Sequence, residues 1–288
     1  MPEGDAVWRT ARRLHEALAG QVLAGSDLRV PALATSDLAG RHTLEVVPRG
    51  KHLLHRLEGG LTLHSHLRMD GSWRVLRRTT TAGDRPRSSR TERHTVRALL
   101  WTEAVVAVGD RLGMLDLVET STEGRVVGHL GPDLLDRAFD RELALDNLLR
   151  DPSVEVGLAL LDQRNLAGIG TIYATEPLFE HRISPWTPIG ALSRDEVRAV
   201  VDTARLWMVR SCRLGPVPGA ARPGTGPPSP ADGWLPWSYR IFGREARPCP
   251  LCGTTLRSDP IGQQPRERQL THCPGCQPAP SAPADESG

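Results

Sequence analysis

Lysine is nearly absent from this chain of 288 residues: 35 of its 36 basic side chains are arginine, and the exception is Lys51. Arginine and lysine differ in shape, hydration and pKa. A bias this strong removes lysine wherever arginine can replace it, so Lys51 is a candidate for a position that requires a compact ammonium group. Chance survival of one lysine is the alternative, and composition alone does not separate the two.

The chain also lacks long hydrophobic runs and a disulfide framework. No segment approaches the roughly 18 apolar residues of a membrane-spanning helix. The first residues show no basic region followed by an apolar stretch, so we expect no signal peptide. Four of the five cysteines lie within the last forty residues, which is not the pattern of a disulfide-stapled protein. We therefore expect a cytoplasmic protein with no membrane partner.

Charge is distributed unevenly although the net charge is only +2. Residues 1–100 carry 17 basic and 10 acidic side chains, a net of +7, and residues 101–200 carry 9 and 17, a net of −8. Residues 201–288 carry 10 and 7, a net of +3. Basic outer segments around an acidic middle would suit a polyanion held between two parts of the chain. Ordinary variation of surface charge is the alternative explanation for these differences in net charge.

Hydrophobic spacing predicts a helix, then strands, then more helices. A helix is expected over 4–19, followed by short strands from about 22 to 129. VPRGKHLL reads as a hairpin with Lys51 at its tip, and MDGSW as another turn. The segments VEVGLALLDQRN, YATEPLFEH and SRDEVRAVVDTARLWMVR read as helices, the last capped by Ser193. Alternation in LTLHSHL places one set of side chains on a common face: Leu61, Leu63, Ser65 and Leu67.

Two Cys-x-x-Cys pairs near the end of the chain give the strongest single signal. They are Cys249, Cys252, Cys273 and Cys276, with twenty residues between the pairs. This spacing predicts one tetrahedral zinc ion, which is structural because four cysteine ligands leave no open position. Cys212 lies outside the set. The segment between the pairs predicts a hairpin with Arg266 and Arg268 near its tip, which could reach a phosphate or simply be solvated.

Two further features are weak when taken alone. The turn AGIGT carries Gly168 and Gly170 and precedes a helix whose N-terminus could grip a phosphate, although a plain helix–helix turn is the simpler interpretation. Removal of Met1 would leave Pro2 with a secondary amine of pKa near 8, and Glu3 beside it as an acid or base. Such an amine can attack carbon at the aldehyde oxidation level. Many chains begin Met-Pro-Glu without this chemistry.

Together these motifs resemble the formamidopyrimidine-DNA glycosylase and endonuclease VIII family over about residues 1–277. The resemblance includes the PEG start, PRGKHL, SHLRMDGSWRV, LLDQRNLAGIGTIYATEPLF and the closing RQLTHCPGCQ. PEGD and SHLRMDGSWRV look closer to the endonuclease VIII branch, and specifically to its actinobacterial members. Five motifs in the same order make chance an inadequate explanation.

The resemblance implies an α+β multidomain fold. It comprises an N-terminal β-sandwich with flanking helices (1–130), a helix-two-turn-helix domain (131–214) and a four-cysteine zinc-finger hairpin (234–277). Composition predicts the remaining parts, a flexible Pro/Gly-rich linker (215–233) and a disordered tail (278–288). The resemblance implies a bifunctional DNA glycosylase and AP lyase of base excision repair that removes oxidised bases, with pyrimidines favoured. A purine-type enzyme for formamidopyrimidines or 8-oxoguanine, and a catalytically weak damaged-DNA-binding relative, are the alternatives.

The same resemblance implies a monomer associated with the nucleoid, with damaged DNA as partner, one zinc ion and no small-molecule cofactor. Pro2 would attack C1′ of a flipped-out nucleotide, and Glu3 would protonate the sugar ring oxygen. Lys51 would contact the phosphate at the lesion and assist both steps. Arg268 would grip a phosphate flanking the lesion, with Arg266 as a weaker candidate.

The resemblance also implies a wedge that fills the gap left by the flipped base. The matching loop is Arg68, Met69 and Asp70, with Met69 as the adaptable wedge and a buried strand residue as the alternative. One departure concerns Gly168 and Gly170, which the family follows with asparagine where this chain has Thr171. A hydroxyl still donates one hydrogen bond, but with shorter reach.

Overall fold

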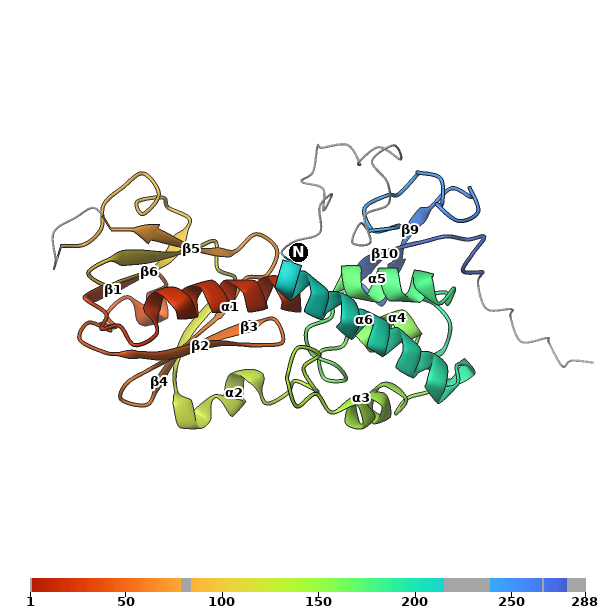
Figure 1. Ribbon diagram of the computed structural model, residues 1–288, viewed down its shortest axis with the longest axis horizontal. Helices are drawn as coiled ribbons and strands as arrows, with labels where there is room; N and C mark the ends of the chain where they lie inside the picture. Colours follow the sequence, from red (N-terminus) through yellow and green to blue (C-terminus); the bar gives the residue numbers. More distant parts are fainter. Residues whose placement is uncertain (1, 79–83, 215–238, 266, 279–288) are drawn as a thin grey trace, which may run out of the picture. The chain divides into compact units, whose positions relative to one another are not determined.

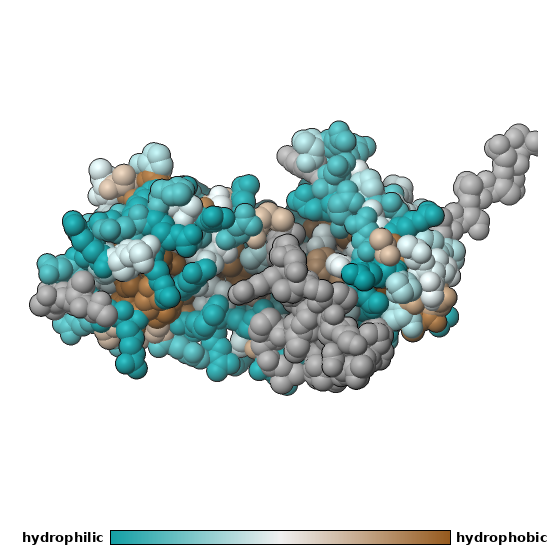
Figure 2. All heavy atoms as spheres, turned by 90° about the horizontal axis from the view of Figure 1, so that it is seen from above, coloured by the Kyte–Doolittle hydropathy of each residue, from teal (hydrophilic) through white to brown (hydrophobic). Residues whose placement is uncertain are grey.

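The computed structural model describes residues 2–78, 84–214, 239–265 and 267–278. The chain divides into two compact units, Met1–Leu130 and Gly131–Gly288 (Figure 1). Arg266, the expected linker and residues 279–288 of the expected tail lie outside the described residues. Within the described ranges, no helix combines the length and apolar character needed to cross a membrane. Most of the surface visible in Figure 2 is hydrophilic, with smaller hydrophobic areas.

The N-terminal unit is a sandwich of two antiparallel four-stranded sheets, as expected (Figure 1). The strand orders are β1-β6-β7-β5 and β2-β3-β4-β8. The strands are β1 (Gly25–Leu28), β2 (Thr43–Arg49), β3 (His52–Leu57), β4 (Leu61–His66), β5 (Ser72–Arg77), β6 (Val96–Trp101), β7 (Val105–Asp110) and β8 (Met114–Glu119). The helical elements are α1 (Gly4–Leu18), α2 (Gly124–Val127) and the short 3₁₀ turns η1 (Pro31–Leu33) and η2 (Thr120–Thr122).

The core of this unit joins α1 to the facing surfaces of both sheets. One apolar stripe of α1 is fully buried, at the positions from which the helix is predicted: Val7, Ala11, Leu14 and Leu18. Leu63 and Leu67 belong to the same core, and Ser65 between them accepts a hydrogen bond of 3.1 Å from Trp73 Nε1. The expected apolar face of 61–67 is therefore confirmed, with its one hydroxyl satisfied.

The opposite face of the β2-β3-β4-β8 sheet is also buried in large part, which the alternating pattern did not predict. Thr62 and His64 are fully buried on it. Arg56 lies on the same face and donates to Glu123 at 2.8 and 2.7 Å, and Glu123 also accepts from Thr62. Because Glu123 follows η2, these bonds hold the segment after β8 over the polar face. Polar residues that alternate with apolar ones along a strand are ordinarily exposed to solvent, but here Thr62 and His64 are covered by polar partners.

The C-terminal unit contains a helical core and a two-stranded hairpin. Its elements are α3 (Arg141–Leu148), α4 (Val156–Leu161), α5 (Thr171–Glu180), η3 (Ile189–Ala191), α6 (Arg194–Leu214), β9 (Arg257–Ile261) and β10 (Arg268–His272). The Ser193 cap is confirmed as a capping box, since Glu196 N–H donates to Ser193 Oγ and Ser193 N–H donates to the Glu196 carboxylate. The helix expected to include DQRN is shorter, because α4 ends at Leu161 and Asp162 adopts an extended backbone.

The finger hairpin packs directly on the helical core. Ile261 and Leu270, one from each strand, belong to the cluster formed by α3 to α6. Gly157 of α4 permits this approach, since a Cβ there would lie 2.8 Å from the Ile261 side chain and 3.0 Å from that of Leu270. Gln277 donates to Ile183 O at 2.7 Å and accepts from Cys273 N–H at 3.0 Å. The end of the finger is thereby fastened to the turn after α5.

A single buried carboxylate anchors the segment that leads into the finger. Glu176 of α5 is fully buried and accepts backbone hydrogen bonds from Arg240 (3.0 Å), Ile241 (2.9 Å) and Phe242 (2.7 Å). Burial raises the pKa of Glu176, while the three N–H groups act in the opposite direction. Ile241 in turn packs in the small core of the finger with Phe179 and Leu256.

We expect Glu176→Gln to reduce the free energy of unfolding of the C-terminal unit by about 1.5–3 kcal/mol, the range of hydrogen bonds to charged groups. In Glu176→Gln, one of the two accepting oxygens becomes an NH₂ group. That donor would face a backbone N–H donor, so at least one of the three hydrogen bonds would be lost. Urea unfolding and amide exchange at 240–242 measure the effect. Glu245→Gln, at an exposed position of the same unit, is the control. Equal stability of the two variants would contradict this role for Glu176.

Candidate functional site

The start of the chain places Pro2 and Glu3 at the N-terminus of α1. Pro2 is half-buried and Glu3 is 1% exposed. Glu3 has an extended backbone and precedes the first helical residue, and its carbonyl accepts the N–H of Val7 at 3.0 Å. Asp5 is buried in the first turn and pairs with Arg9 at 2.9 Å. A carboxylate at this end of a helix is electrostatically favourable.

Lys51 lies at the tip of the hairpin between β2 and β3, as predicted. Arg49 and His52 are the last paired residues, so Gly50 and Lys51 form a two-residue loop. Gly50 has a φ of 57°, which suits the first central position of a type II′ turn. Lys51 is half-buried. The register of the hairpin therefore fixes the single lysine of the chain at one end of the sheet.

The loop between β4 and β5 presents Met69 to solvent, with 64% of its surface exposed. A buried strand position for Met69 is thus wrong. Arg68 has a φ of 51°, and its N–H donates to His66 Nδ1 at 2.9 Å. Gly71 closes the loop, because a Cβ there would lie 2.3 Å from Leu67 O. Since His66 Nδ1 accepts, the neutral His66 ring carries its proton on Nε2.

Sequence reasoning missed a group of four histidines beside the Lys51 hairpin. His52 Nδ1 lies 2.7 Å from His64 Nε2, and the His52 ring stands edge-on to His66 and His129 at centroid distances of 4.8 and 6.1 Å. Burial, followed by repulsion from neighbouring cationic groups including Lys51, lowers the pKa of His52 to about 3 and that of His66 to about 4. Histidines at every second residue of β4 were the available signal.

The second predicted motif is the turn between α4 and α5. Gly168 has a φ of 101°, which side chains rarely adopt, and its N–H donates to Gln163 Oε1 at 3.1 Å. Gln163 also donates to the carbonyls of Leu161 and Ile169, both at 2.9 Å. Gln163 thus fixes the turn, a role that the sequence did not reveal. The backbone at Gly168 confirms the need for glycine there.

The turn delivers Thr171 to the N-terminus of α5. Gly170 is the N-cap residue, and Thr171 is the first helical residue and half-buried. An anion is favoured at this end of a helix by the helix dipole. Arg268 lies elsewhere in the unit, as the first residue of β10 opposite Ile261, and is exposed at the end of the hairpin.

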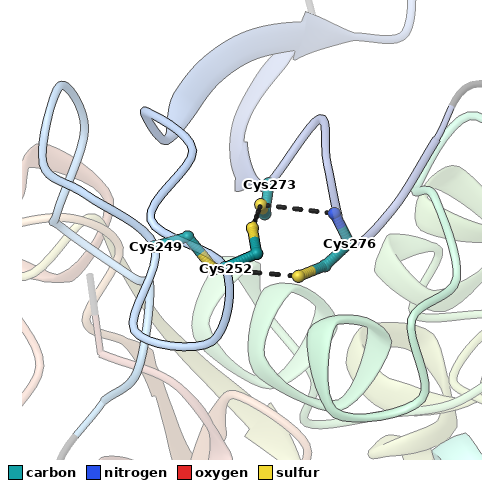
Figure 3. Close-up of side chains that lie close together, drawn as sticks. All are labelled: Cys249, Cys252, Cys273 and Cys276. Carbon is teal, nitrogen blue, oxygen red and sulfur yellow. Dashed lines mark hydrogen bonds between the residues drawn. The ribbon is translucent and has the colours of Figure 1, made fainter.

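The four cysteines converge from two loops of the finger (Figure 3). Their sulfur atoms all lie within 4.8 Å of one another. The Cys249–Cys276 and Cys252–Cys273 sulfur distances are 3.8 and 3.4 Å. A tetrahedral ion with ligands at about 2.3 Å requires about 3.8 Å between sulfurs, so the arrangement fits a bound metal. Leu251 N–H donates to Cys249 Sγ and Cys276 N–H to Cys273 Sγ, both at 3.4 Å.

The chemistry of the four thiols also fits a cation. Hydrogen bonds from Thr254 lower the pKa of Cys252 to about 6, so one thiolate is available to a cation, whereas burial raises the pKa of Cys273 and Cys276, whose ionisation then requires a compensating positive charge. Gly275 brings the loops together, since a Cβ there would lie 2.7 Å from Thr254 Oγ1 and 3.2 Å from Cys252 Sγ. The cysteines therefore form a structural metal site.

Family comparison covers most of the chain. Residues 1–117 match the formamidopyrimidine-DNA glycosylase N-terminal domain, and residues 130–216 match the formamidopyrimidine-DNA glycosylase H2TH domain. The chain is 48% identical over 281 residues to "Probable endonuclease 8 2" of Streptomyces coelicolor, covering 98% of this chain and 95% of the relative. It is 38% identical to the "DNA-(apurinic or apyrimidinic site) lyase Nei2" of Mycolicibacterium smegmatis, covering 97% and 100% of the two chains.

Solved structures agree. MutM (Fpg) from Thermus thermophilus superposes with a TM-score of 0.70 at 29% identity, covering 96% of this chain and 98% of that chain. A Lactococcus lactis formamidopyrimidine-DNA glycosylase bound to DNA containing an AP site gives a TM-score of 0.74 at 21% identity, covering 96% and 100%, which shows a common fold. The chain belongs to the formamidopyrimidine-DNA glycosylase and endonuclease VIII family, within its actinobacterial endonuclease VIII branch.

Proposed function

We propose that this protein is a bifunctional DNA glycosylase and AP lyase of base excision repair that removes oxidised bases. The observation that carries the proposal is the similarity, over nearly its whole length, to relatives named as endonuclease 8 and as an apurinic or apyrimidinic site lyase. This chain keeps Pro2, Glu3 and Lys51, the groups that such chemistry requires.

The proposed reaction begins at the N-terminal amine. With Met1 removed, the Pro2 nitrogen attacks C1′ of a nucleotide flipped out of the duplex, and the C1′–base bond breaks. Glu3 protonates the ring oxygen, so the sugar opens and an iminium ion joins C1′ to the Pro2 nitrogen. The burial of Glu3 at the start of α1 supports this role, because it fixes the position of the carboxyl group next to Pro2.

The iminium ion makes the C2′ proton acidic. Loss of that proton passes its electron pair toward the nitrogen, and the enamine then expels the 3′ phosphate in a β-elimination. A second elimination at C4′–C5′ expels the 5′ phosphate and leaves a one-nucleotide gap. Lys51 contacts the phosphate at the lesion and assists both steps, since an ammonium group offers three donors to a phosphate.

Each unit contributes DNA contacts in this proposal. In the N-terminal unit, Met69 enters the gap left by the flipped base and Arg68 lies beside it, which their exposed loop favours. In the C-terminal unit, Gly168, Gly170 and Thr171 contact phosphate through the start of α5, and Arg268 binds a flanking phosphate. Arg266 is a further candidate from the sequence alone.

The substrate preference rests on the branch to which the chain belongs. Because this chain is similar to relatives named endonuclease 8, we propose that it prefers oxidised pyrimidines such as thymine glycol over 8-oxoguanine and formamidopyrimidines. A panel of oligonucleotides with single lesions separates the two. We further propose that the protein acts as a monomer at the nucleoid, that the metal is zinc, and that no small-molecule cofactor takes part.

We expect borohydride to trap a covalent complex between the protein and an abasic oligonucleotide through Pro2. Pro2→Gly should reduce trapping by at least about tenfold, or 1.4 kcal/mol, because a primary amine does not give a permanently cationic iminium ion. Intact mass spectrometry first establishes that Met1 is absent. Pro31→Gly, at an exposed turn, is the control. Unchanged trapping by Pro2→Gly, or trapping by protein that retains Met1, would refute the nucleophile assignment.

Lys51→Arg should retain most of the DNA affinity and lose turnover. Arginine keeps the positive charge but is larger and does not release its proton. Gel-shift titration measures the affinity, and single-turnover nicking of an abasic duplex measures the rate. Arg12→Lys, on the exposed side of α1, is the matched conservative change. Full nicking activity in Lys51→Arg would mean that the lone lysine has no chemical role.

Cys273→Ser should abolish the bound zinc and with it the DNA affinity of the finger, while the N-terminal unit stays folded. The three remaining sulfurs would leave one ligand position to a weaker oxygen donor. Inductively coupled plasma mass spectrometry gives the metal and its stoichiometry. Cys212→Ser, outside the four-cysteine set, should keep one zinc ion per chain. A different metal in the purified wild type would overturn the zinc assignment.

A further inference from the structure

Three side chains on adjacent strands form a continuous hydrogen-bonded chain in the N-terminal unit. Asp116 of β8 lies opposite His64 of β4, and its Oδ2 is 3.0 Å from His64 Nδ1. His64 Nε2 is 2.7 Å from Nδ1 of His52, the first residue of β3. His52 follows Lys51 directly, so the chain runs from the Lys51 hairpin to the surface of β8.

The partners determine where the protons lie. The Asp116 carboxylate can only accept, so His64 donates from Nδ1. In neutral His64, Nε2 is then an acceptor, and His52 must donate from its own Nδ1. His52 Nε2 is left as a lone pair, and no side chain in the described part of the protein hydrogen-bonds to it. The chain thus has a proton-acceptor end at His52 and a carboxylate end at Asp116.

The surroundings of His52 disfavour a positive charge on that ring. His64 and His66 face it from β4, His129 from the segment after α2, and Lys51 from the adjoining turn. Burial and these neighbours hold the pKa of His52 at about 3. Next along the chain, His64 Nε2 is the hydrogen-bonded acceptor for His52, and His64 Nδ1 faces the Asp116 carboxylate. A proton that reaches His52 therefore has a continuous hydrogen-bonded route through His64.

We propose that His52, His64 and Asp116 form a proton relay that carries protons away from the Lys51 side of the site during the elimination steps. The inference deepens the proposed function and rests on it. Each elimination breaks one C–H bond, expels a phosphate and releases one proton, so a reaction shielded from water needs a route for that proton. Neither the two histidines nor the aspartate has a role in the proposed attack by Pro2.

One proton moves along the chain at each elimination, with no change in oxidation state. His52 Nε2 takes up one proton, and the His52 Nδ1 proton passes to His64 Nε2, giving an imidazolium ion whose Nδ1–H remains on Asp116. The Nδ1 proton then passes to Asp116 and to water. Asp116 can release this proton to water because 47% of its side chain is exposed. The His64 side chain, in contrast, is fully buried. Once the product leaves and water refills the site, the starting tautomers return: His52 Nε2 loses its proton to that water, His64 passes its Nε2 proton back to His52 Nδ1, and Asp116 returns a proton from solvent to His64 Nδ1.

His64→Gln provides the sharpest test. The glutamine amide can donate to Asp116 and accept from His52, so it preserves both hydrogen bonds but cannot transmit a proton. Two rates are measured on one abasic duplex under single-turnover conditions: formation of the borohydride-trapped adduct, and strand nicking. We expect nicking to fall on the order of 100-fold, adduct formation to stay unchanged and the trapped adduct to accumulate. The solvent deuterium isotope effect on nicking should also change.

Asp116→Asn supplies a second variant, at a side chain that is 47% exposed and keeps almost the same shape. It should slow nicking relative to trapping in the same sense, and Glu103→Gln, an exposed carboxylate in the turn after β6, should not. A parallel fall of trapping and nicking would indicate a structural role and overturn the relay, as would unaltered nicking in both variants. Wild-type protein that neither traps nor nicks would overturn the proposed function, and with it the relay.

Discussion

The need to pair buried polar groups on one face of the β2-β3-β4-β8 sheet organises the N-terminal unit. Arg56 forms bonds of 2.6 and 2.7 Å to Glu45 and Glu123, and hydrogen bonding to Arg56 lowers the pKa of Glu123. Glu123 is largely buried, and a buried carboxylate left without its partner is costly. The segment after β8 therefore has to lie over this face. By covering it, the segment brings His129 close to His52 and so encloses the base of the Lys51 hairpin.

The C-terminal unit uses the same principle with a different partner. Glu176 directs one carboxylate at three consecutive backbone N–H groups, which have no other secondary structure to satisfy them. This fixes the entry to the finger, and Gln277 fixes its exit. Between the two, the metal ligands close the loops. The position of Arg268 thus depends on polar contacts to α5 as much as on the metal. A finger that kept its metal but lost the contacts of Glu176 would no longer be held in a fixed position on the helical core.

The sequence was sufficient where periodicity or spacing was informative. The stripe of α1, the hairpin around Lys51, the capping box at Ser193 and the cysteine pairs all depend on local patterns. The polar face of the sheet was missed because Thr62, His64 and His66 alternate with leucine, which ordinarily indicates solvent exposure. Their partners Asp116 and Glu123 are more than fifty residues away. No single-sequence pattern pairs such distant residues, and the same limit hid the contacts of Glu176.

The neighbours of Lys51 help to explain why this position holds lysine. His52 and His66 are held neutral, so Lys51 supplies the positive charge on its turn without competition from two imidazolium ions. Arginine could supply that charge equally well, and a phosphate contact alone would favour its fork of donors. What arginine cannot do is give up a proton, since the pKa of its guanidinium group lies far above neutral pH. A position that both holds a phosphate and takes part in proton transfer requires lysine. The proposed part of Lys51 in both elimination steps therefore accounts for lysine at this position.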